Sequence, residues 1–336
     1  MITDIPTPTD FHEAGINLLN LAWDSTVSLL IDRIESPGEL NTDYLASDEY
    51  WKSAQPILTS SLSLIQQSVE FFLKGKIAEV SPYLLITSNP ANWPKGSDKG
   101  NASFSDFRTI DSQDLIRVHD IVSKTRLSDP FRQWYEELRR LRNKLMHTVD
   151  TTISVTDQNV LVKILEACDY CINPRSWIRT RNQYLRYIPS EHILNEFPPE
   201  AMDENVKTAY RLGKLQREIM TVIEYLEPRY SKKFFGFNKR ERRYICLYCL
   251  SCRENEYFFE YKDLEQLYLH SAQIVDRISP SSNTICCIFC NGQYLVERKQ
   301  CSNCGENMID AQNGLCLSCT PSIPIDVDLQ TPIESI

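Results

Sequence analysis

The chain has 336 residues, a length that suggests about two domains. Its 36 basic and 45 acidic side chains give a net charge of −9, so the molecule as a whole is not a basic nucleic-acid coat. We expect no membrane span, because we find no apolar run of roughly 18 residues, and no secretory signal, because the N-terminal segment is polar and acidic. Glycine is scarce and neither GxGxxG nor GxxxxGK(S/T) occurs, which excludes the common phosphate-binding loops.

Apolar residues recur at helical spacing through most of the first 230 residues, so the sequence predicts a mainly α-helical protein. The segment 88–107 is rich in Ser, Asn, Gly and Pro and is predicted to be a loop, and 174–200 is predicted to be irregular. The predicted helices cover 11–35, 52–80, 111–124, 130–147, 157–172 and 203–228, and a further helix over 262–278 is inserted in the C-terminal region.

Polar residues cluster at the end of the predicted helix 130–147. Its core face carries aromatic and leucine side chains, and Arg142 falls within this same stripe. Burying a guanidinium is costly unless an anionic or polar group meets it. Asn143 and His147 are four residues apart and share the neighbouring polar side of the helix. The helix end therefore gathers Arg142, Asn143 and His147.

This Arg-Asn-x-x-x-His pattern, late in an all-helical domain, resembles the motif of the HEPN superfamily. The segment Ser68–Lys76 is similar to the Glu-and-Lys helix of such domains, and Phe-Arg-Thr-Ile-Asp at 107–111 is also similar to the family. The resemblance covers roughly residues 10–150 and implies a HEPN-like helical bundle. Many family members are metal-independent endoribonucleases that act as dimers. The resemblance thus implies RNA as the substrate, a homodimer, catalytic Arg142 and His147, and an assisting Asn143.

The chemistry of RNA cleavage suits these residue types. Attack by the 2′-hydroxyl needs a base that titrates near neutrality, and histidine has an unperturbed pKa of about 6.5. Arginine presents a planar fork of donors to phosphate oxygens. Alternatively, Arg142 snorkels or pairs with an acid such as Glu70, and His147 is a cation at the C-terminal end of the helix dipole. That alternative corresponds to a non-enzymatic adaptor, which binds nucleic acid or a protein partner.

Ten of the twelve cysteines fall between Cys246 and Cys319, mostly as Cys-x-x-Cys steps, which indicates metal sites and a reducing, cytoplasmic compartment. We predict two zinc ions with a structural role, because all-Cys ligation leaves no open position for catalysis. Cys252 and Cys286 remain and either could replace a neighbouring ligand, and a pairing of Cys287/Cys290 with Cys301/Cys304 is also possible. The predicted ligands are Cys246, Cys249, Cys287 and Cys290 for one ion, and Cys301, Cys304, Cys316 and Cys319, with zinc-ribbon spacing, for the other.

Two further patterns contain residues that could be functional. Cys168 and Cys171 also form a Cys-x-x-Cys step, but inside a predicted helix, so we expect them to pack in the core. The segment 231–243 has a local charge of +5 and three phenylalanines, which favours binding to a phosphate backbone with stacking on bases, or a solvated linker. The predicted RNA-binding residues are Lys232, Lys233, Lys239, Arg240, Arg242 and Arg243.

The sequence therefore predicts a HEPN-like helical domain over 1–150 and a helical extension or bridge over 151–230. A basic linker and zinc-ribbon region follows over 231–320, and then a disordered acidic tail over 321–336. We expect a metal-independent endoribonuclease, for which family analogy suggests the role of a toxin or defence effector, with the adaptor as the competing hypothesis.

Overall fold

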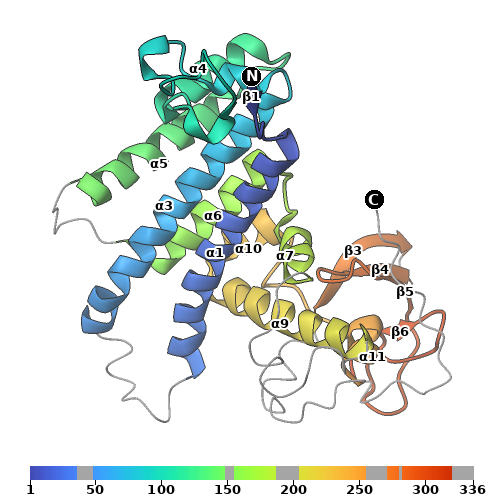
Figure 1. The fold of residues 1–336 in the computed structure, drawn as a ribbon. Coiled ribbons are helices and arrows are strands. Elements are labelled where there is room, and N and C mark those ends of the chain that lie inside the picture. The colour runs from blue at the N-terminus through green and yellow to red at the C-terminus, as the bar shows by residue number, and fades with distance from the viewer. Residues whose placement is uncertain (36–47, 148–154, 187–203, 255–270, 280–281, 320–336) are drawn as a thin grey trace. The chain divides into compact units, whose positions relative to one another are not determined.

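The computed structural model of the chain (Figure 1) describes residues 1–35, 48–147, 155–186, 204–254, 271–279 and 282–319. The chain divides into two compact units, unit 1 (Met1–Pro174) and unit 2 (Arg175–Ile336). Most of the described secondary structure is helical, as predicted, and the Cys-rich region belongs to unit 2. The boundary between the units falls inside the segment 151–230. The predicted disordered tail, 321–336, lies outside the described residues.

Unit 1 is built around α3 (Asp48–Ala78), which packs along α1 (Pro8–Glu35) and also contacts α4 (Ser112–Val122), α5 (Asp129–His147) and α6 (Asp157–Cys171). Figure 1 shows α1, α3 and α6 running side by side. These bounds agree with the predicted helices to within a few residues. The fully buried side chains of α1 and α3 include Leu19, Ala22, Trp23, Leu30, Leu58, Leu62, Ile65, Val69 and Ile77.

Local polar contacts fix where the helices of unit 1 begin. At the start of α1 the backbone N–H of Thr7 donates to Asp10 Oδ2 (2.7 Å), while the backbone N–H of Asp10 donates to Thr7 Oγ1 (3.2 Å). This reciprocal pair satisfies donors that a helix N-terminus otherwise leaves free. These hydrogen bonds from Thr7 lower the pKa of Asp10. In α6 the side chain of Thr156 caps the first turn by accepting from the N–H of Asn159 (3.1 Å).

The segment between α3 and α4 contains only short elements, in agreement with the predicted loop over 88–107. Its 3-10 turns cover Pro82–Leu85, Pro90–Asn92 and Phe104–Asp106. Strand β2 (Ala102–Ser103) pairs in parallel with β1 (Ile2–Thr3). The loop is thereby tied to the N-terminus of unit 1.

One described helix is long and apolar enough to cross a membrane by length and composition alone, over Pro8–Arg33. The sequence prediction of no such segment therefore does not hold by this criterion. The apolar side chains of this helix form part of the core of unit 1, where Leu19, Ala22 and Trp23 are completely buried. A core helix has the same composition as a membrane-spanning one when most of its apolar face packs inside the protein.

Unit 2 combines short helices with a small sheet. Its helices are α7 (Trp177–Leu185), α9 (Glu204–Tyr225), α10 (Pro228–Phe235) and α11 (Leu247–Glu254). The sheet is antiparallel in the order β3 (Ala272–Ser279), β4 (Ser282–Cys287), β5 (Gln293–Glu297) and β6 (Ile309–Asp310). In its register Ile285 pairs with Tyr294 and Val296 with Asp310.

Two sequence predictions for unit 2 are wrong. The predicted helix over 262–278 is instead strand β3 from Ala272 onward, and its earlier part lies outside the described residues. In β3, Ala272 and Gln273 are buried whereas Val275 is 62% exposed, and the register with β4 shifts between Ile274 and Asp276. The predicted irregular segment 174–200 contains α7, which forms because Trp177 and Ile178 are buried and Arg181 has a buried acidic partner.

That partner is Glu218 of α9, which accepts from Arg181 Nε and Nη2 at 2.9 Å each. Both side chains are almost completely buried. We expect Arg181→Met to lower the free energy of unfolding by about 3–5 kcal/mol, because it leaves the Glu218 charge buried without its partner. Urea unfolding followed by circular dichroism measures this loss. The double variant Arg181→Met/Glu218→Leu should lose less than the single variant, and an equal or larger loss would contradict this account.

Candidate functional site

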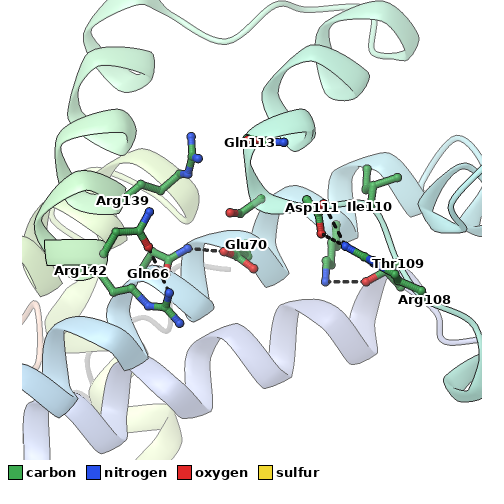
Figure 2. A pocket seen from close by; sticks show the side chains of 12 residues that line it. Gln66, Glu70, Arg108, Thr109, Ile110, Asp111, Gln113, Arg139 and Arg142 are labelled. Atoms are coloured by element: carbon green, nitrogen blue, oxygen red, sulfur yellow. Dashed lines mark hydrogen bonds and ion pairs between the residues drawn. The ribbon is translucent and has the colours of Figure 1, made fainter. Parts of the chain in front are cut away.

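A polar cavity of about 470 Å³ lies in unit 1 between α3, α5 and the segment that enters α4 (Figure 2). Its lining carries four cationic and two acidic side chains, so it offers an anion more cations than it can neutralise internally. The lining residues are Gln66, Glu70, Lys74, Arg108, Thr109, Ile110, Asp111, Ser112, Gln113, Arg139, Arg142 and Asn143.

Helix α3 contributes Gln66, Glu70 and Lys74, which are four residues apart and therefore share one face. The amide of Gln66 donates a hydrogen bond to Glu70 Oε1, and Lys74 Nζ donates to Thr109 Oγ1 at 3.2 Å. Burial raises the pKa of Glu70, opposed by the nearby Lys74 ammonium. Burial also lowers the pKa of Lys74, opposed by Glu70. Each charge thus partly opposes the effect of burial on its neighbour.

Helix α5 contributes Arg139, Arg142 and Asn143, and Figure 2 shows both arginines on the side of the cavity that faces Gln66 and Glu70. Arg142 Nη1 donates to Asn143 Oδ1 at 3.1 Å, and Arg139 Nη1 pairs with Glu136 Oε1 at 2.7 Å. Among the described residues Arg142 forms no ion pair, and its buried Nε has no hydrogen-bond partner. In the alternative interpretation Arg142 pairs with Glu70, but the structure shows only a longer-range attraction between the two, which partly opposes the rise that burial causes in the pKa of Glu70.

The structure brings together two of the three predicted catalytic residues. Arg142 and Asn143 both line the polar cavity. His147 is the last residue of α5, and its side chain lies outside the part of the chain that the structure describes. The core face predicted for this helix is confirmed over its first part, where Phe131, Trp134, Tyr135 and Leu138 are buried, whereas the later Leu141 and Leu145 are only partly buried.

Sequence reasoning singled out parts of the other wall of the cavity, through the resemblance of Ser68–Lys76 and of residues 107–111 to the family, but assigned these residues no role in a site. Gln66, Glu70 and Lys74 interrupt the apolar stripe of α3 at a spacing of four residues, which is the signal that could have revealed them. The side chains of Arg108 and Asp111, which belong to the Phe-Arg-Thr-Ile-Asp segment at 107–111, pair across 3.2 Å at the entrance to α4. Arg108 and Asp111 line the cavity because the fold brings the start of α4 next to α3 and α5.

Eight cysteines of unit 2 form two groups of four sulfur atoms, and within each group all four atoms lie within 4.8 Å of one another. The first group is Cys246, Cys249, Cys287 and Cys290, and the second is Cys301, Cys304, Cys316 and Cys319. This confirms the predicted grouping and rules out the pairing of Cys287/Cys290 with Cys301/Cys304.

The sulfur spacing fits tetrahedral metal coordination. In the first group Cys246 Sγ lies 3.4 Å from Cys290 Sγ, and Cys249 Sγ lies 3.7 Å from Cys287 Sγ. The corresponding distances in the second group are 3.7 Å and 3.6 Å. Four sulfurs held tetrahedrally about 2.3 Å from a zinc ion would be about 3.8 Å apart. Both groups are therefore compatible with structural metal sites.

Hydroxyl groups surround the first group. The hydroxyl of Tyr294 accepts from the backbone N–H of Tyr248 (3.0 Å), which leaves its own proton to be donated to Cys246 Sγ at 3.2 Å. Ser271 Oγ lies 3.0 Å from Cys287 Sγ. A Cβ at Gly292 would lie only 3.1 Å from both Cys290 Sγ and the Tyr294 hydroxyl, so a side chain here would press on a ligand sulfur and on its hydrogen-bond partner. Such contacts orient ligands and lower the charge density on their sulfurs.

The second group is more open and relies on a tight turn. Gly305 has φ +75°, a conformation that favours glycine, and its N–H donates to the carbonyl of Cys301 at 2.9 Å. Cys304 is exposed, whereas Cys246, Cys249 and Cys287 of the first group are fully buried. Water and chelators therefore reach the second group more easily.

The remaining cysteines belong to neither group. Cys286 is half-buried on β4, next to the ligand Cys287, and the side chain of Cys252 lies outside the described residues. Cys168 is completely buried in α6, which confirms the predicted core packing, and Cys171 is partly covered. Burial raises the pKa of the Cys171 thiol, so this thiol is neutral near pH 7.

The basic aromatic stretch of unit 2 is only partly available to a ligand. Phe234, Phe235 and Phe237 are buried, so the predicted stacking of bases on these rings is wrong. Three of the predicted cations already have partners within the chain. Arg242 pairs with Glu306 (2.8 Å), and Arg243 pairs with Glu224. Lys239 Nζ donates to the backbone carbonyls of Glu224 (2.7 Å) and Leu226 (2.6 Å). The other three, Lys232, Lys233 and Arg240, are exposed.

Comparisons with protein-family models, with curated proteins and with solved structures each found no match. Function must therefore be argued from the polar cavity and the two cysteine groups themselves.

We expect protein loaded with two equivalents of Zn²⁺ to lose them to a chromogenic chelator in two phases, the exposed second group first. Tyr294→Phe should accelerate only the slow phase, by about tenfold, because it removes a hydrogen bond to a ligand of the first group. The fast phase is an internal control, and Tyr244→Phe is a control for loss of a buried hydroxyl in the same unit. Equal acceleration of both phases would show that the substitution acts on folding instead.

Proposed function

We propose that the chain is a HEPN-type endoribonuclease that cleaves RNA at the polar cavity of unit 1, with zinc holding the cysteine groups of unit 2. The observation that carries the proposal is the position of Arg142. It lies at a cation-rich cavity beside Asn143, and its guanidinium is not consumed by an ion pair with a described carboxylate. A guanidinium in this setting remains able to bind a phosphate oxygen.

The proposed reaction is attack of a ribose 2′-oxygen on the adjacent phosphorus. His147 takes the 2′-hydroxyl proton while water protonates the departing 5′-oxygen, or His147 protonates the 5′-oxygen while water takes the 2′-hydroxyl proton. Either way the products are a 2′,3′-cyclic phosphate and a 5′-hydroxyl. Arg142 stabilises the extra negative charge on the phosphorane, and Asn143 orients the phosphate or His147. Lys74 and Arg139 add positive charge to the same cavity.

The cysteine groups support a structural role for zinc. An all-Cys set closes the coordination sphere, and soft thiolates select zinc over hard cations such as Mg²⁺. Each group links segments that are distant in the sequence, such as α11 with the end of β4. Zinc bound there would stabilise the small sheet of unit 2, which has little apolar core of its own.

We further propose that the protein acts as a cytoplasmic homodimer that joins two Arg142 sites. The dimer rests on the HEPN resemblance, and an exposed apolar side chain next to the motif, Met146 at 51% exposure, is consistent with a covered surface there. The exposed Lys232, Lys233 and Arg240 of unit 2 would add non-specific contacts to the RNA backbone.

Purified full-length protein is expected to cleave a mixed RNA pool in excess EDTA and to leave 2′,3′-cyclic phosphate ends. Arg142→Ala should reduce the rate by about 10²–10³-fold, because it removes a donor to the charge that develops on phosphorus. His147→Ala should reduce it by about 10²–10⁴-fold. Arg140→Ala is the matched control, since Arg140 is exposed on the same helix and does not line the cavity, and its rate should change little.

Zinc content has to be measured in each sample, because EDTA could remove the ions of unit 2 and unfold it. Cleavage that is unaffected by Arg142→Ala would contradict the proposed site. No cleavage by folded, zinc-loaded wild type would instead support the adaptor, in which Glu70 and Arg142 serve only to balance buried charge.

A further inference from the structure

Unit 1 contains a second and larger cavity, of about 660 Å³, that shares no lining residue with the polar cavity. It lies where the ends of α3, α4 and α6 meet the loop 123–128 and the start of α5. Protein interiors are normally packed with few voids, and ligand cavities commonly measure about 300–1,000 Å³. A hollow of this size at the meeting point of four helices is therefore a candidate for a ligand site.

The floor of this second cavity is aromatic. Phe131 is buried and makes an edge-to-face contact with Tyr170, with ring centroids 5.5 Å apart. Tyr170 itself remains 43% exposed, and Val80 beside the cavity is 54% exposed. An accessible aromatic ring against a buried one offers a planar ligand both apolar surface and a π-face.

A positioned imidazole supplies a polar group. His119 is only 6% exposed, and its Nδ1 is hydrogen-bonded to Asp120 Oδ1 at 3.0 Å. Asp120 is held in turn by the N–H of Leu127 (2.9 Å) and by Arg132. Among the described residues no partner is seen for His119 Nε2. The contact with Asp120 fixes the orientation of the ring, and His119 is one of the residues that line the cavity.

Two cations remain available at the same cavity. Lys124 and Arg126 lie in the loop 123–128, are exposed, and have no ion-pair partner among the described residues. The third cation, Lys76, is paired with Glu79 at 2.8 Å. Positive charge beside an aromatic floor selects ligands that carry an anionic group on an apolar ring.

We propose that this second cavity binds a small aromatic anion, with its ring against Tyr170 and Phe131 and its anionic group at Lys124 and Arg126. Its polar edge would meet His119 Nε2. The same chemistry belongs to two classes of ligand, nucleoside phosphates and aromatic carboxylates. The proposal does not depend on RNA cleavage, because it uses none of the residues of the polar cavity.

Isothermal titration calorimetry on the full chain tests the proposal with four probes. AMP and indole-3-acetate each combine an aromatic ring with an anionic group. Adenosine carries only the ring system, and inorganic phosphate carries only the anionic group. We expect AMP or indole-3-acetate to bind and both half-probes to bind at least about tenfold more weakly. Tighter binding of AMP assigns the site to nucleoside phosphates, and tighter binding of indole-3-acetate assigns it to aromatic carboxylates.

Variants locate the binding. Lys124→Ala and Arg126→Ala should each weaken the affinity for the preferred probe by about tenfold, because each removes a charge-assisted contact at an exposed position where folding is not at risk. Lys95→Ala, at an exposed lysine that lines neither cavity, should leave it unchanged. Failure of both ring-bearing anions to bind at millimolar concentration would overturn the proposal. A loss of affinity in Arg142→Ala but not in Lys124→Ala or Arg126→Ala would also overturn it, by placing the ligand in the polar cavity.

Discussion

The half-buried charges of Glu70 and Lys74 on α3 are the constraint around which unit 1 is arranged. The same helix carries the apolar side chains that pack on α1, so its polar face has to be matched from another direction. Helix α5 and the entrance to α4 provide that match by presenting arginines and hydroxyl groups. The cavity that results holds more positive than negative charge (Figure 2), and an anion would complete it. The proposed RNA phosphate would neutralise this excess positive charge.

Features that are local in the sequence could be predicted well. Apolar periodicity located the helices of unit 1, because each buries a single stripe against its neighbours. The spacing of Cys-x-x-Cys steps located all eight ligands, because two cysteines in one tight turn have few alternatives. Their division into two groups was left open by the sequence and follows from the positions of the sulfur atoms in the fold. The position of Arg142 within an apolar stripe was also informative, since a charge in that place requires a polar environment.

Features that depend on tertiary contacts could not be predicted. Ile274 and Ile278 have the spacing of a helix, yet this segment pairs with β4 in an antiparallel sheet. Phe234, Phe235 and Phe237 lie among lysines in the sequence but are part of the core of unit 2, so the charges stay outside while the rings are buried. The second cavity has no sequence motif, and the segment Ser68–Lys76 did not by itself reveal the polar cavity, because each cavity is made by elements that meet only in the folded chain.

The most direct test of the account is a crystal structure of the full chain with a short 2′-O-methyl RNA, which cannot be cleaved by attack of its own 2′-oxygen. The account predicts a phosphate in the polar cavity of unit 1, within hydrogen-bonding distance of the Arg142 guanidinium and near Lys74. The same structure would show where the His147 side chain lies relative to the 2′-oxygen. RNA bound only to unit 2, with the Arg142 guanidinium paired to Glu70, would contradict the central claim.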